Sequence, residues 1–406
     1  MHTLIQLIKK CPPLMAVIQW LLRTLEQIHQ LYLKLCWQIF VRLPLKERKV
    51  IFCNFYGGGF GDNPKFIAEE MIRRDLGFEM YWVCAHPEMV FPAPIRSVKP
   101  NSTAFAYHMA TAKFLVENTR RQYYFIKRPG QFYIQTWHGG PGLKKVEMDV
   151  QAALSDEYIA YAKRDSACID LFLSCCRWCS DLYHRAFWYS GPILERGIPK
   201  NDLYFTDHGE ARRKIEEYYH IPAGKKIVLY APTYRDNRAT DMYNLDYDRV
   251  LAALENRFGG DWYCLIRLHP NLAAQAGIVP TGEKLRNATL YENMQELLVA
   301  SDVIISDYSG CAFDYLVLKR PGFLYAEDYE EIKKVKDYYF TLEELPFSLA
   351  QSNDALIHNI ETFDEAEYDK KCAAYVQRIQ FFDDGHASEA AVDAMLAQLS
   401  PARDNR

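Results

Sequence analysis

The sequence predicts an α/β protein with two successive parallel sheets and an amphipathic helix ahead of the first. Apolar runs of strand length alternate with helical patterns along most of the chain, as in doubly wound proteins. A Gly- and Pro-rich stretch at 191–202 divides this alternation into two parts. Residues 1–47 show helical apolar spacing instead. We therefore expect a helical segment at 1–47, a first domain at 48–195 and a second domain at 196–400.

The composition fits a globular protein and excludes several other classes. Of the 406 residues, 49% are hydrophobic and 25% are charged, so the chain can bury a large core and is neither disordered nor collagenous. The net charge of −4 argues against a nucleic-acid binder. The 11 Cys residues are odd in number and scattered, which fits a reducing cytoplasm.

The amino-terminal segment predicts an amphipathic helix over residues 14–41. One face carries Gln, Arg, Lys and Glu, and the other face is apolar. The apolar stripe consists of Leu14, Val17, Ile18, Leu21, Leu25, Ile28, Leu31, Leu35 and Ile39. No run of 18 uncharged residues exists, which excludes a membrane span, and no small-residue cleavage site marks a signal peptide.

Two interpretations of this helix stay open. Residues 1–50 hold eight Lys or Arg and two Glu, a net charge of +6, and Trp20 and Trp37 suit a lipid headgroup boundary. These features favour attachment to an anionic membrane surface. The alternative is a helix packed on the protein's own core or in a dimer, because a strongly amphipathic pattern serves both purposes.

The first strand of the body is predicted at 49–55 and leads through a Gly-rich loop into a helix at 66–74. Asp62 or Asn63 can cap this helix, with Pro64 in its first turn. Backbone amides at such a helix start can hold an anion. A plain tight turn explains the glycines equally well.

Three further strands are predicted at 81–85, 113–116 and 132–137, and the last ends in WHGGPGLKK at 137–145. His138 therefore lies at the carboxyl end of a strand, where ligand sites of open α/β sheets form. A histidine can accept a proton near pH 7, and the neighbouring glycines allow a ligand to approach. Lys144 and Lys145 can neutralise phosphate.

Cys168, Cys175, Cys176, Cys179 and His184 crowd into one short segment. Their side chains are of metal-ligating types, but paired C-x-x-C spacing is absent. The pattern of a buried strand followed by a helix at 169–189 favours buried thiols that act as small apolar residues. We therefore predict no metal site here.

The second half repeats the alternation, with helices predicted at 210–219, 247–258, 294–300 and 311–318, strands at 226–230, 262–268, 303–306 and 322–325, and Ser388 capping a closing helix. Polar side chains follow three strand ends: Thr233 and Arg235, Arg267 and His269, and Ser306, Asp307 and Ser309. Such strand ends meet at one edge of a parallel sheet, so they predict one anion-binding cleft. Ser309 either binds phosphate at a helix start or serves only as an N-cap. Asp307 would repel phosphate, so we expect it to orient neighbours or bind a sugar hydroxyl.

Seven short motifs, in order, resemble the bacterial CDP-glycerol:poly(glycerophosphate) glycerophosphotransferases, which build teichoic acids and related capsules. They are DNPK at 62–65, WHGGPGLK at 137–144, GIPKND at 197–202, YAPTYRD at 230–236, RLHP at 267–270, SDVIISDYSGCAFD at 301–314 and DGHAS at 384–388. The resemblance covers roughly residues 48–395. The loop after His138 is one residue longer than the family's WHGTPLK, and Gly310 and Cys311 replace the family's usual small residues.

The resemblance implies a GT-B architecture, in which two Rossmann-like domains face each other across a cleft. It implies that His138 is the general base and that His269 contacts the donor diphosphate. The implied donor-binding residues are Thr233, Arg235, Arg267, Ser306, Asp307, Ser309 and Ser388. The implied acceptor-binding residues are Gly59, Asp62, Asn63, Lys65, Gly139, Lys144 and Lys145. No cofactor is required, and assistance by Mg²⁺ is left open.

The family's reaction implies transfer of glycerol phosphate from CDP-glycerol to a hydroxyl of a polyprenyl-diphosphate-linked saccharide, with release of CMP. We expect a peripheral protein at the cytoplasmic face of the bacterial membrane that binds no nucleic acid, and a homo-oligomer is left open. The alternatives are a CDP-ribitol or other polyol donor, a GT-B sugar-nucleotide glycosyltransferase, and a catalytically silent relative that binds lipid intermediates. The presence of both His138 and His269 argues against the silent relative.

Overall fold

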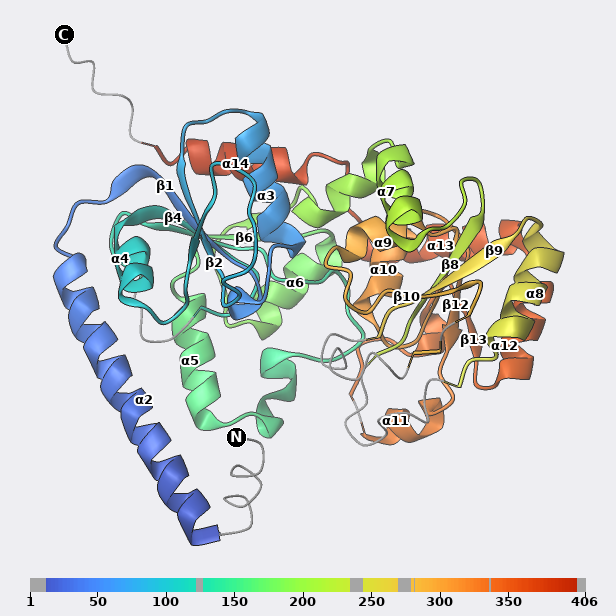
Figure 1. Ribbon diagram of the computed structural model, residues 1–406, viewed down its shortest axis with the longest axis horizontal. Coiled ribbons are helices and arrows are strands. Elements are labelled where there is room, and N and C mark those ends of the chain that lie inside the picture. The colour runs from blue at the N-terminus through green and yellow to red at the C-terminus, as the bar shows by residue number, and fades with distance from the viewer. Residues whose placement is uncertain are drawn as a thin grey trace.

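Two parallel sheets, one in each half of the chain, form the framework of the protein (Figure 1). The computed structural model describes residues 12–121, 127–233, 244–268, 279–280, 282–335 and 337–399. The first sheet has the strand order β3-β2-β1-β4-β5-β6-β7, and the second has the order β10-β9-β8-β11-β12-β13. All pairings between these strands are parallel. The predicted α/β class with parallel sheets is therefore confirmed.

The first half contains both the amino-terminal helix and the first sheet. Its strands are β1 (Lys46–Cys53), β2 (Glu79–Val83), β3 (Arg96–Val98), β4 (Ala112–Glu117), β5 (Phe132–Gln135), β6 (Leu171–Leu173) and β7 (Ile193–Leu194). Its helices are α2 (Pro12–Phe40), α3 (Asp62–Arg73), α4 (Thr103–Thr111), α5 (Asp156–Ser166) and α6 (Arg177–Ala186). Short 3-10 turns lie at η1 (Phe55–Gly57), η2 (Glu147–Ala153) and η3 (Pro199–Phe205).

The second half is built in the same way. Its strands are β8 (Lys226–Ala231), β9 (Trp262–Ile266), β10 (Leu285–Asn287), β11 (Val303–Ser306), β12 (Gly322–Tyr325) and β13 (Ser348–Ala350). Its helices are α7 (Gly209–Tyr219), α8 (Tyr247–Phe258), α9 (Met294–Ala300), α10 (Gly310–Leu316), α11 (Tyr329–Val335), α12 (Asn353–Glu361), α13 (Glu365–Ile379) and α14 (Ala387–Leu396), with the turn η5 (Leu342–Glu344).

The central strand β1 shows why the sequences of the strands are continuous apolar runs. Ile51 and Cys53 belong to the largest hydrophobic cluster of the protein. Val50 and Phe52, which point to the other face, belong to a second cluster. Because both faces of the sheet are covered, the five positions 49–53 of β1 are all buried and no polar alternation remains there.

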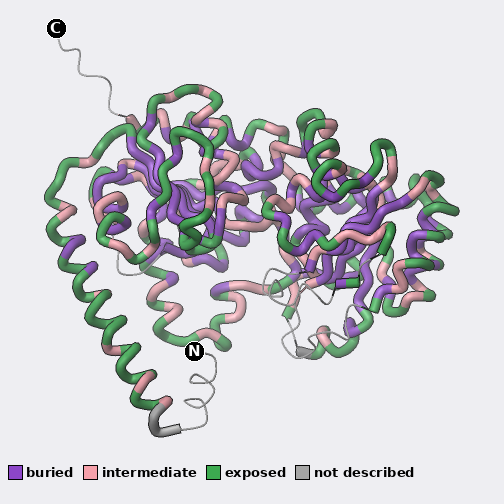
Figure 2. Tube along the Cα trace, in the orientation of Figure 1, coloured by how far each residue is buried: buried purple, intermediate pink, exposed green. Residues whose placement is uncertain are grey.

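Helix α2 occupies most of the predicted helical segment, and most of its residues are exposed (Figure 2). Val17, Leu21, Leu25, Ile28, Leu31, Leu35 and Ile39 are between 47% and 62% exposed. The helix contacts α4, and Leu33, Cys36 and Trp37 enter the core there. The prediction that Trp37 lies at a lipid boundary is therefore wrong, because its ring is 5% exposed and packs inside the protein. Among the described residues, no helix is long and apolar enough to cross a membrane.

Helix α14 returns from the second half to the first sheet, where Figure 1 shows it in red beside the blue helix α3. Ala391, Val392 and Met395 are fully buried in the cluster that also contains Val50 and Phe52. Its sequence position placed α14 in the predicted domain 196–400. Its apolar face instead completes the core of the first half, so the prediction is wrong for this helix.

A buried ion network near β4 yields a test of stability. Arg120 Nη2 lies 2.9 Å from Glu147 Oε2, Arg120 Nη1 lies 3.4 Å from Asp165 Oδ2, and all three side chains are at most 4% exposed. Arg120→Leu would leave the buried carboxylate of Glu147 without its cation and Asp165 with only Arg121, whose Nε lies 4.0 Å from Asp165 Oδ1. We expect the free energy of unfolding, measured by urea denaturation, to fall by about 3–5 kcal/mol.

The control for this prediction is the exposed ion pair between Lys46 and Glu79, whose atoms are 2.9 Å apart and whose side chains are each 44% exposed. Solvent screens such a pair, so Glu79→Gln should change the free energy of unfolding by less than about 1 kcal/mol. Equal losses in the two variants would contradict the assignment of stability to the buried network.

Candidate functional site

His138 lies in the loop that follows β5, at the carboxyl edge of the first sheet. The chain turns sharply there, because Trp137 has a left-handed φ of 50°. His138 Nδ1 lies 2.8 Å from the carbonyl oxygen of Asn118, just beyond the neighbouring strand β4. A carbonyl oxygen only accepts, so Nδ1 carries the proton in the neutral ring and Nε2 keeps its lone pair. This is the tautomer that a general base needs.

The electrostatic surroundings keep His138 unprotonated at neutral pH. Burial lowers the pKa of the imidazole, and this effect outweighs the hydrogen bond to Asn118 and the carboxylate of Asp62, which both raise the pKa. The ammonium group of Lys200 lowers it further. The net pKa is below the usual value of histidine, so the ring is ready to accept a proton at pH 7.

Lys200, in η3, connects the loop that carries His138 (residues 137–145, here called the base loop) to the second half of the chain. Its Nζ donates to Asp314 Oδ2 at 2.8 Å and to the carbonyl of His138 at 3.4 Å, and it lies 3.9 Å from Asp62 Oδ2. Lys200 is 3% exposed. Burial alone would lower the pKa of its ammonium group, but Asp314 and Asp62 raise it above the usual value. The buried lysine therefore stays charged between a carboxylate of α3 and a carboxylate of α10.

Asn63 and Asp202 fix the chain on either side of Lys200. The buried Asn63 donates from Nδ2 to the carbonyl of Trp137 at 3.1 Å, and its Oδ1 accepts from the backbone amide of Lys200 at 3.0 Å. Asp202 accepts from the backbone amides of Ala387 and Ser388 at 2.9 and 2.7 Å, at the start of α14. The motif at 197–202 thus joins the base loop, α3 and α14.

The carboxyl end of the base loop contacts the second half of the chain. Lys144 forms an antiparallel bridge with Tyr338. The backbone amide of Lys145 donates to the carbonyl of Asp337 at 3.1 Å, and its Nζ lies 3.4 Å from Asp337 Oδ1. We predicted both lysines as acceptor contacts. The structure pairs Lys145 with a carboxylate and leaves the side chain of Lys144 exposed.

Glycines border open space on both sides of this contact. A Cβ atom added to Gly139 of the base loop, or to Gly310 at the start of α10, would meet no atom within 4 Å. A Cβ atom on Gly140 would lie 3.9 Å from Asp314 Oδ1. Asp314 is about 6 Å along α10 from Gly310. The base loop and the start of α10 therefore lie close together and both have free space beside them.

The predicted donor-binding residues at β8 and β11 lie together, as expected for neighbouring strand ends. Thr233 donates to Asp307 Oδ1 from its amide at 2.9 Å and from Oγ1 at 2.5 Å. Ser306 Oγ donates to the carbonyl of Ala231 at 2.7 Å. Asp307 thus orients its neighbour, one of the two roles expected for it.

The other predicted donor-binding residues differ in their surroundings. Ser309 is the N-cap of α10 and accepts from the amide of Cys311 at 3.4 Å. Arg267 donates from Nη1 to the carbonyls of Ala288 and Tyr291, and burial lowers the pKa of its guanidinium. Arg235 and His269 lie outside the described residues.

Two predicted acceptor-binding residues lie along the Gly-rich loop and α3. The carbonyl of Gly59 accepts from Trp82 Nε1 at 3.0 Å and from Asn54 Nδ2 at 3.2 Å. Lys65 Nζ lies 3.8 Å from Glu69 Oε1 and 5.7 Å from the centre of the Phe60 ring. These contacts organise the loop, whereas Asp62 and Asn63 reach the base.

Sequence reasoning missed Asn118, Lys200 and Asp314. Asn118 follows a predicted strand end, so the argument applied to His138 would have found it. Lys200 and Asp314 stand inside two of the seven motifs. Their pairing across 114 residues of sequence leaves no local signal.

The cysteine cluster is buried, as the sequence pattern at 169–189 predicts. Cys175, Cys176 and Cys179 are fully buried, and their Sγ atoms lie within 4.8 Å of one another. Cys176 caps α6 and accepts from the amide of Cys179. The thiols pack between the base loop and α6, since a Cβ atom on Gly140 would lie 3.2 Å from Cys175 Sγ.

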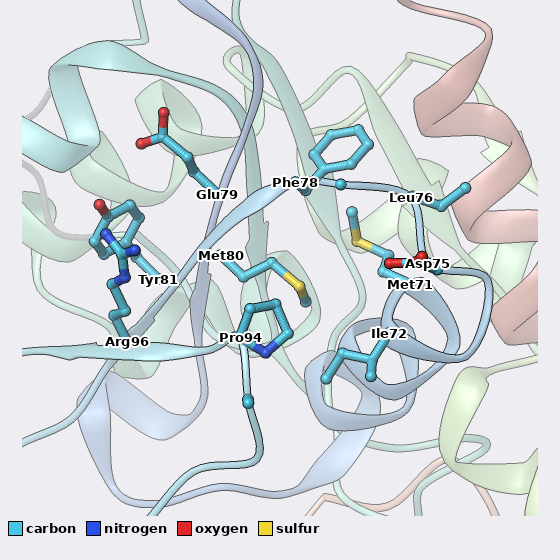
Figure 3. Close-up of a pocket in the computed structure, with 12 residues that line it drawn as sticks. Met71, Ile72, Asp75, Leu76, Phe78, Glu79, Met80, Tyr81, Pro94 and Arg96 are labelled. Atoms are coloured by element: carbon cyan, nitrogen blue, oxygen red, sulfur yellow. The ribbon is translucent and has the colours of Figure 1, made fainter.

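A cavity of about 540 Å³ lies at the opposite edge of the first sheet (Figure 3). Met71, Leu76, Phe78, Met80 and Pro94 line its apolar part, and Asp75, Glu79 and Arg96 add charged groups. These residues come from the end of α3 and the beginnings of β2 and β3. The cavity is therefore separate from the site at His138, which lies beyond the carboxyl end of a parallel strand.

Two charge-removing variants should move the pKa of His138 in opposite directions. Lys200→Met removes a cation and should raise this pKa, and Asp62→Asn removes an anion and should lower it. Titration of the imidazole signals by NMR measures both. Shifts of the same sign in the two variants would show that structural disturbance, rather than charge, controls the base.

Comparisons with known proteins agree with the resemblance found in the motifs. The family model described as CDP-Glycerol:Poly(glycerophosphate) glycerophosphotransferase matches residues 35–397. The teichoic acid glycerol-phosphate transferase of Staphylococcus aureus (strain NCTC 8325 / PS 47) is 29% identical over 365 residues, which cover 86% of this chain and 92% of that protein. A solved structure of the wall teichoic acid polymerase TagF is similar, with a TM-score of 0.80 and 27% identity over 94% of this chain and 97% of the chain in that structure.

Some relatives are much longer than this chain. The teichoic acid poly(glycerol phosphate) polymerase of Bacillus subtilis (strain 168) is 29% identical over 372 residues, which cover 87% of this chain and 49% of that protein. The chain also spans about half the length of the corresponding polymerase of Staphylococcus epidermidis. The family model nevertheless matches most of the chain. The protein therefore belongs to the CDP-glycerol:poly(glycerophosphate) glycerophosphotransferase family.

Proposed function

We propose that the protein transfers glycerol phosphate from CDP-glycerol to a hydroxyl of a membrane lipid-linked acceptor, with release of CMP, in teichoic acid biosynthesis. The observation that carries the proposal is His138, a neutral imidazole whose Nδ1–H is fixed by Asn118 and whose Nε2 is free to accept a proton. Relatives named for glycerol-phosphate transfer support the reaction. A TagF variant soaked with CDPG, with a TM-score of 0.81 and 26% identity, supports the donor.

In the proposed reaction, the acceptor hydroxyl oxygen attacks the phosphorus that bears glycerol. A new P–O bond forms, the bond to the CMP phosphate breaks, and its electron pair leaves with CMP. His138 Nε2 takes the hydroxyl proton. Positioning and charge stabilisation dominate such phosphoryl transfers.

The proposal places the donor in a GT-B cleft between the two sheets. Its donor-binding residues are Thr233, Arg235, Arg267, His269, Ser306, Asp307, Ser309 and Ser388. Gly59, Asp62, Asn63, Lys65, Gly139, Lys144 and Lys145 serve the acceptor, with the reacting hydroxyl next to His138. No resident metal is assigned, and assays with and without Mg²⁺ measure any assistance by the ion.

We also propose that α2 holds the protein at the cytoplasmic, anionic surface of the membrane. Seven residues of its apolar stripe are exposed along the helix, and the first 50 residues carry a net charge of +6. Such a helix lies in the interface with its apolar face among the lipid chains. A lipid-linked acceptor would then meet the site at the membrane surface.

The central experiment measures CMP release from CDP-glycerol, with and without a prenyl-diphosphate-linked saccharide that bears one glycerol phosphate. Mass spectrometry of the lipid product then counts the added units. A product heavier by glycerol phosphate supports the proposal and separates a primer from a polymerase. CMP release only from CDP-ribitol, or transfer only from a sugar nucleotide, would show that this compound, rather than CDP-glycerol, is the donor.

Loss of the base should slow transfer without loss of the fold. His138→Ala should reduce turnover about 10²- to 10⁴-fold, because the hydroxyl proton loses its acceptor. The control is His358→Ala, which changes an exposed histidine on α12. Near-normal turnover of a folded His138→Ala variant would contradict the assignment of the base.

Polar substitutions on α2 should release the protein from vesicles. Replacement of Leu21, Leu25, Ile28 and Leu35 by Gln removes exposed apolar groups, so binding to anionic liposomes in a flotation assay should fall at least about tenfold. Gln27→Ala with Gln38→Ala is the control, because it alters exposed polar positions of the same helix. Equal flotation of the Gln variant and the unaltered protein would exclude attachment through this stripe.

A further inference from the structure

Two aromatic residues beside the base, Phe55 and Tyr56, are held in a disfavoured backbone conformation. Their φ angles are 41° and 58°, in the left-handed region that side chains rarely adopt. They follow β1 at the carboxyl edge of the first sheet. Gly57, which follows them, also has a positive φ of 96°. Strained residues of this kind collect at functional sites, where the surrounding structure enforces them.

The hydrogen bonds around the turn show how it is enforced. The amide of Phe55 donates to Asn118 Oδ1 at 2.9 Å, and the amide of Gly57 donates to the carbonyl of Asn54 at 2.9 Å. The carbonyl of Gly57 in turn accepts from Ala85 at 2.9 Å. The turn is therefore fixed from three sides and does not depend on burial of the aromatic rings.

Both residues are partly exposed to solvent. Phe55 is 44% exposed and Tyr56 is 51% exposed. A core function would bury them, and a simple turn would use glycine, as the next three positions do. The disfavoured conformation thus presents two aromatic surfaces to solvent beside the base.

Asn118 forms hydrogen bonds both to the turn that carries the two aromatic residues and to the base. Its backbone carbonyl binds His138 Nδ1, and its side-chain oxygen binds the amide of Phe55. The centre of the Phe55 ring lies 5.2 Å from the centre of the His138 ring. The Phe55 ring is therefore a direct neighbour of the base.

We propose that Phe55 and Tyr56 form an aromatic platform that binds a sugar ring of the acceptor. The proposal rests on the proposed function, because it places the ring beside the hydroxyl that His138 deprotonates. An exposed aromatic surface can cover the apolar C–H face of a pyranose while the sugar hydroxyls stay hydrated. The cytosine of the donor also has a flat face. The platform, however, follows a strand of the first sheet, as the base does, whereas the donor-binding residues are assigned mainly to the second sheet.

The test is steady-state kinetics of the full chain with two acceptors, in which either the acceptor or CDP-glycerol is varied while the other is saturating. One acceptor is a prenyl-diphosphate-linked saccharide that bears one glycerol phosphate, and the other is a prenyl-linked glycerol phosphate without saccharide. Phe55→Ala and Tyr56→Ala should each raise the KM for the saccharide acceptor about tenfold. The KM for CDP-glycerol and the kinetics with the saccharide-free acceptor should stay as in the unaltered protein.

Two further variants control for the chemistry and for the fold. Phe55→Tyr keeps a flat ring and should restore the KM for the saccharide acceptor. Tyr218→Ala removes an aromatic ring that is 61% exposed on α7 and should have no effect. Thermal melting of each variant shows whether the fold is kept, and the two alanine variants provide independent readings of the platform.

The outcomes separate this inference from the proposed function. An unaltered KM for the saccharide acceptor in both alanine variants, with normal transfer by the unaltered protein, would overturn the platform alone. A raised KM for CDP-glycerol instead would assign the rings to the cytosine and also overturn it. An unaltered protein that releases no CMP from CDP-glycerol with either acceptor would overturn the proposed function, and the platform with it.

Discussion

The buried ammonium group of Lys200 is the interaction on which the arrangement of the site depends. A lysine without water requires carboxylate partners, because an isolated buried charge is strongly disfavoured. Its partners come from two places: Asp62 at the start of α3 and Asp314 on α10. The same Nζ reaches the carbonyl of His138. The buried ammonium group therefore keeps its partners only when α3, the base loop and α10 stand in their observed positions. The position of the base is thus a consequence of contact between the two halves.

Asn118 adds the second constraint, which concerns chemistry rather than position. Its carbonyl selects the tautomer of His138, while burial and Lys200 keep the ring neutral. A base with a lowered pKa accepts protons weakly, yet it is fully available at neutral pH. Such a base suits a reaction in which the attacking hydroxyl is activated late and most of the rate comes from positioning. In the proposed transfer, the contacts of Asn118 and Lys200 with His138 would contribute that positioning.

Sequence reasoning succeeded where function follows from local pattern. The strand at 303–306 and the helices at 247–258 and 294–300 lie within the predicted bounds, because their apolar spacing is long and regular. The place of His138 after β5 follows from the predicted strand, because a strand end with glycines is a local signal, and its role as a base stays a prediction. The short edge strands β3, β7, β10 and β13 were not predicted, since two or three residues carry no periodicity. Trp37 and α14 were misplaced because their partners, α4 and the first sheet, are distant in sequence.

Helix α2 shows how the same helix can serve two partners. Leu33, Cys36 and Trp37 occupy one narrow contact with the core, which fixes the orientation of the helix. The remaining stripe extends over several turns and stays exposed in the described part of the chain. Exposed apolar area of this extent disfavours the protein in water by about 25 cal/mol per Å², so the stripe requires a cover. In the proposed attachment, the exposed basic residues Arg23 and Lys34 of α2 would repel a second copy of the helix but attract an anionic lipid surface. Charge therefore favours a membrane over a dimer, although both would bury the same apolar residues.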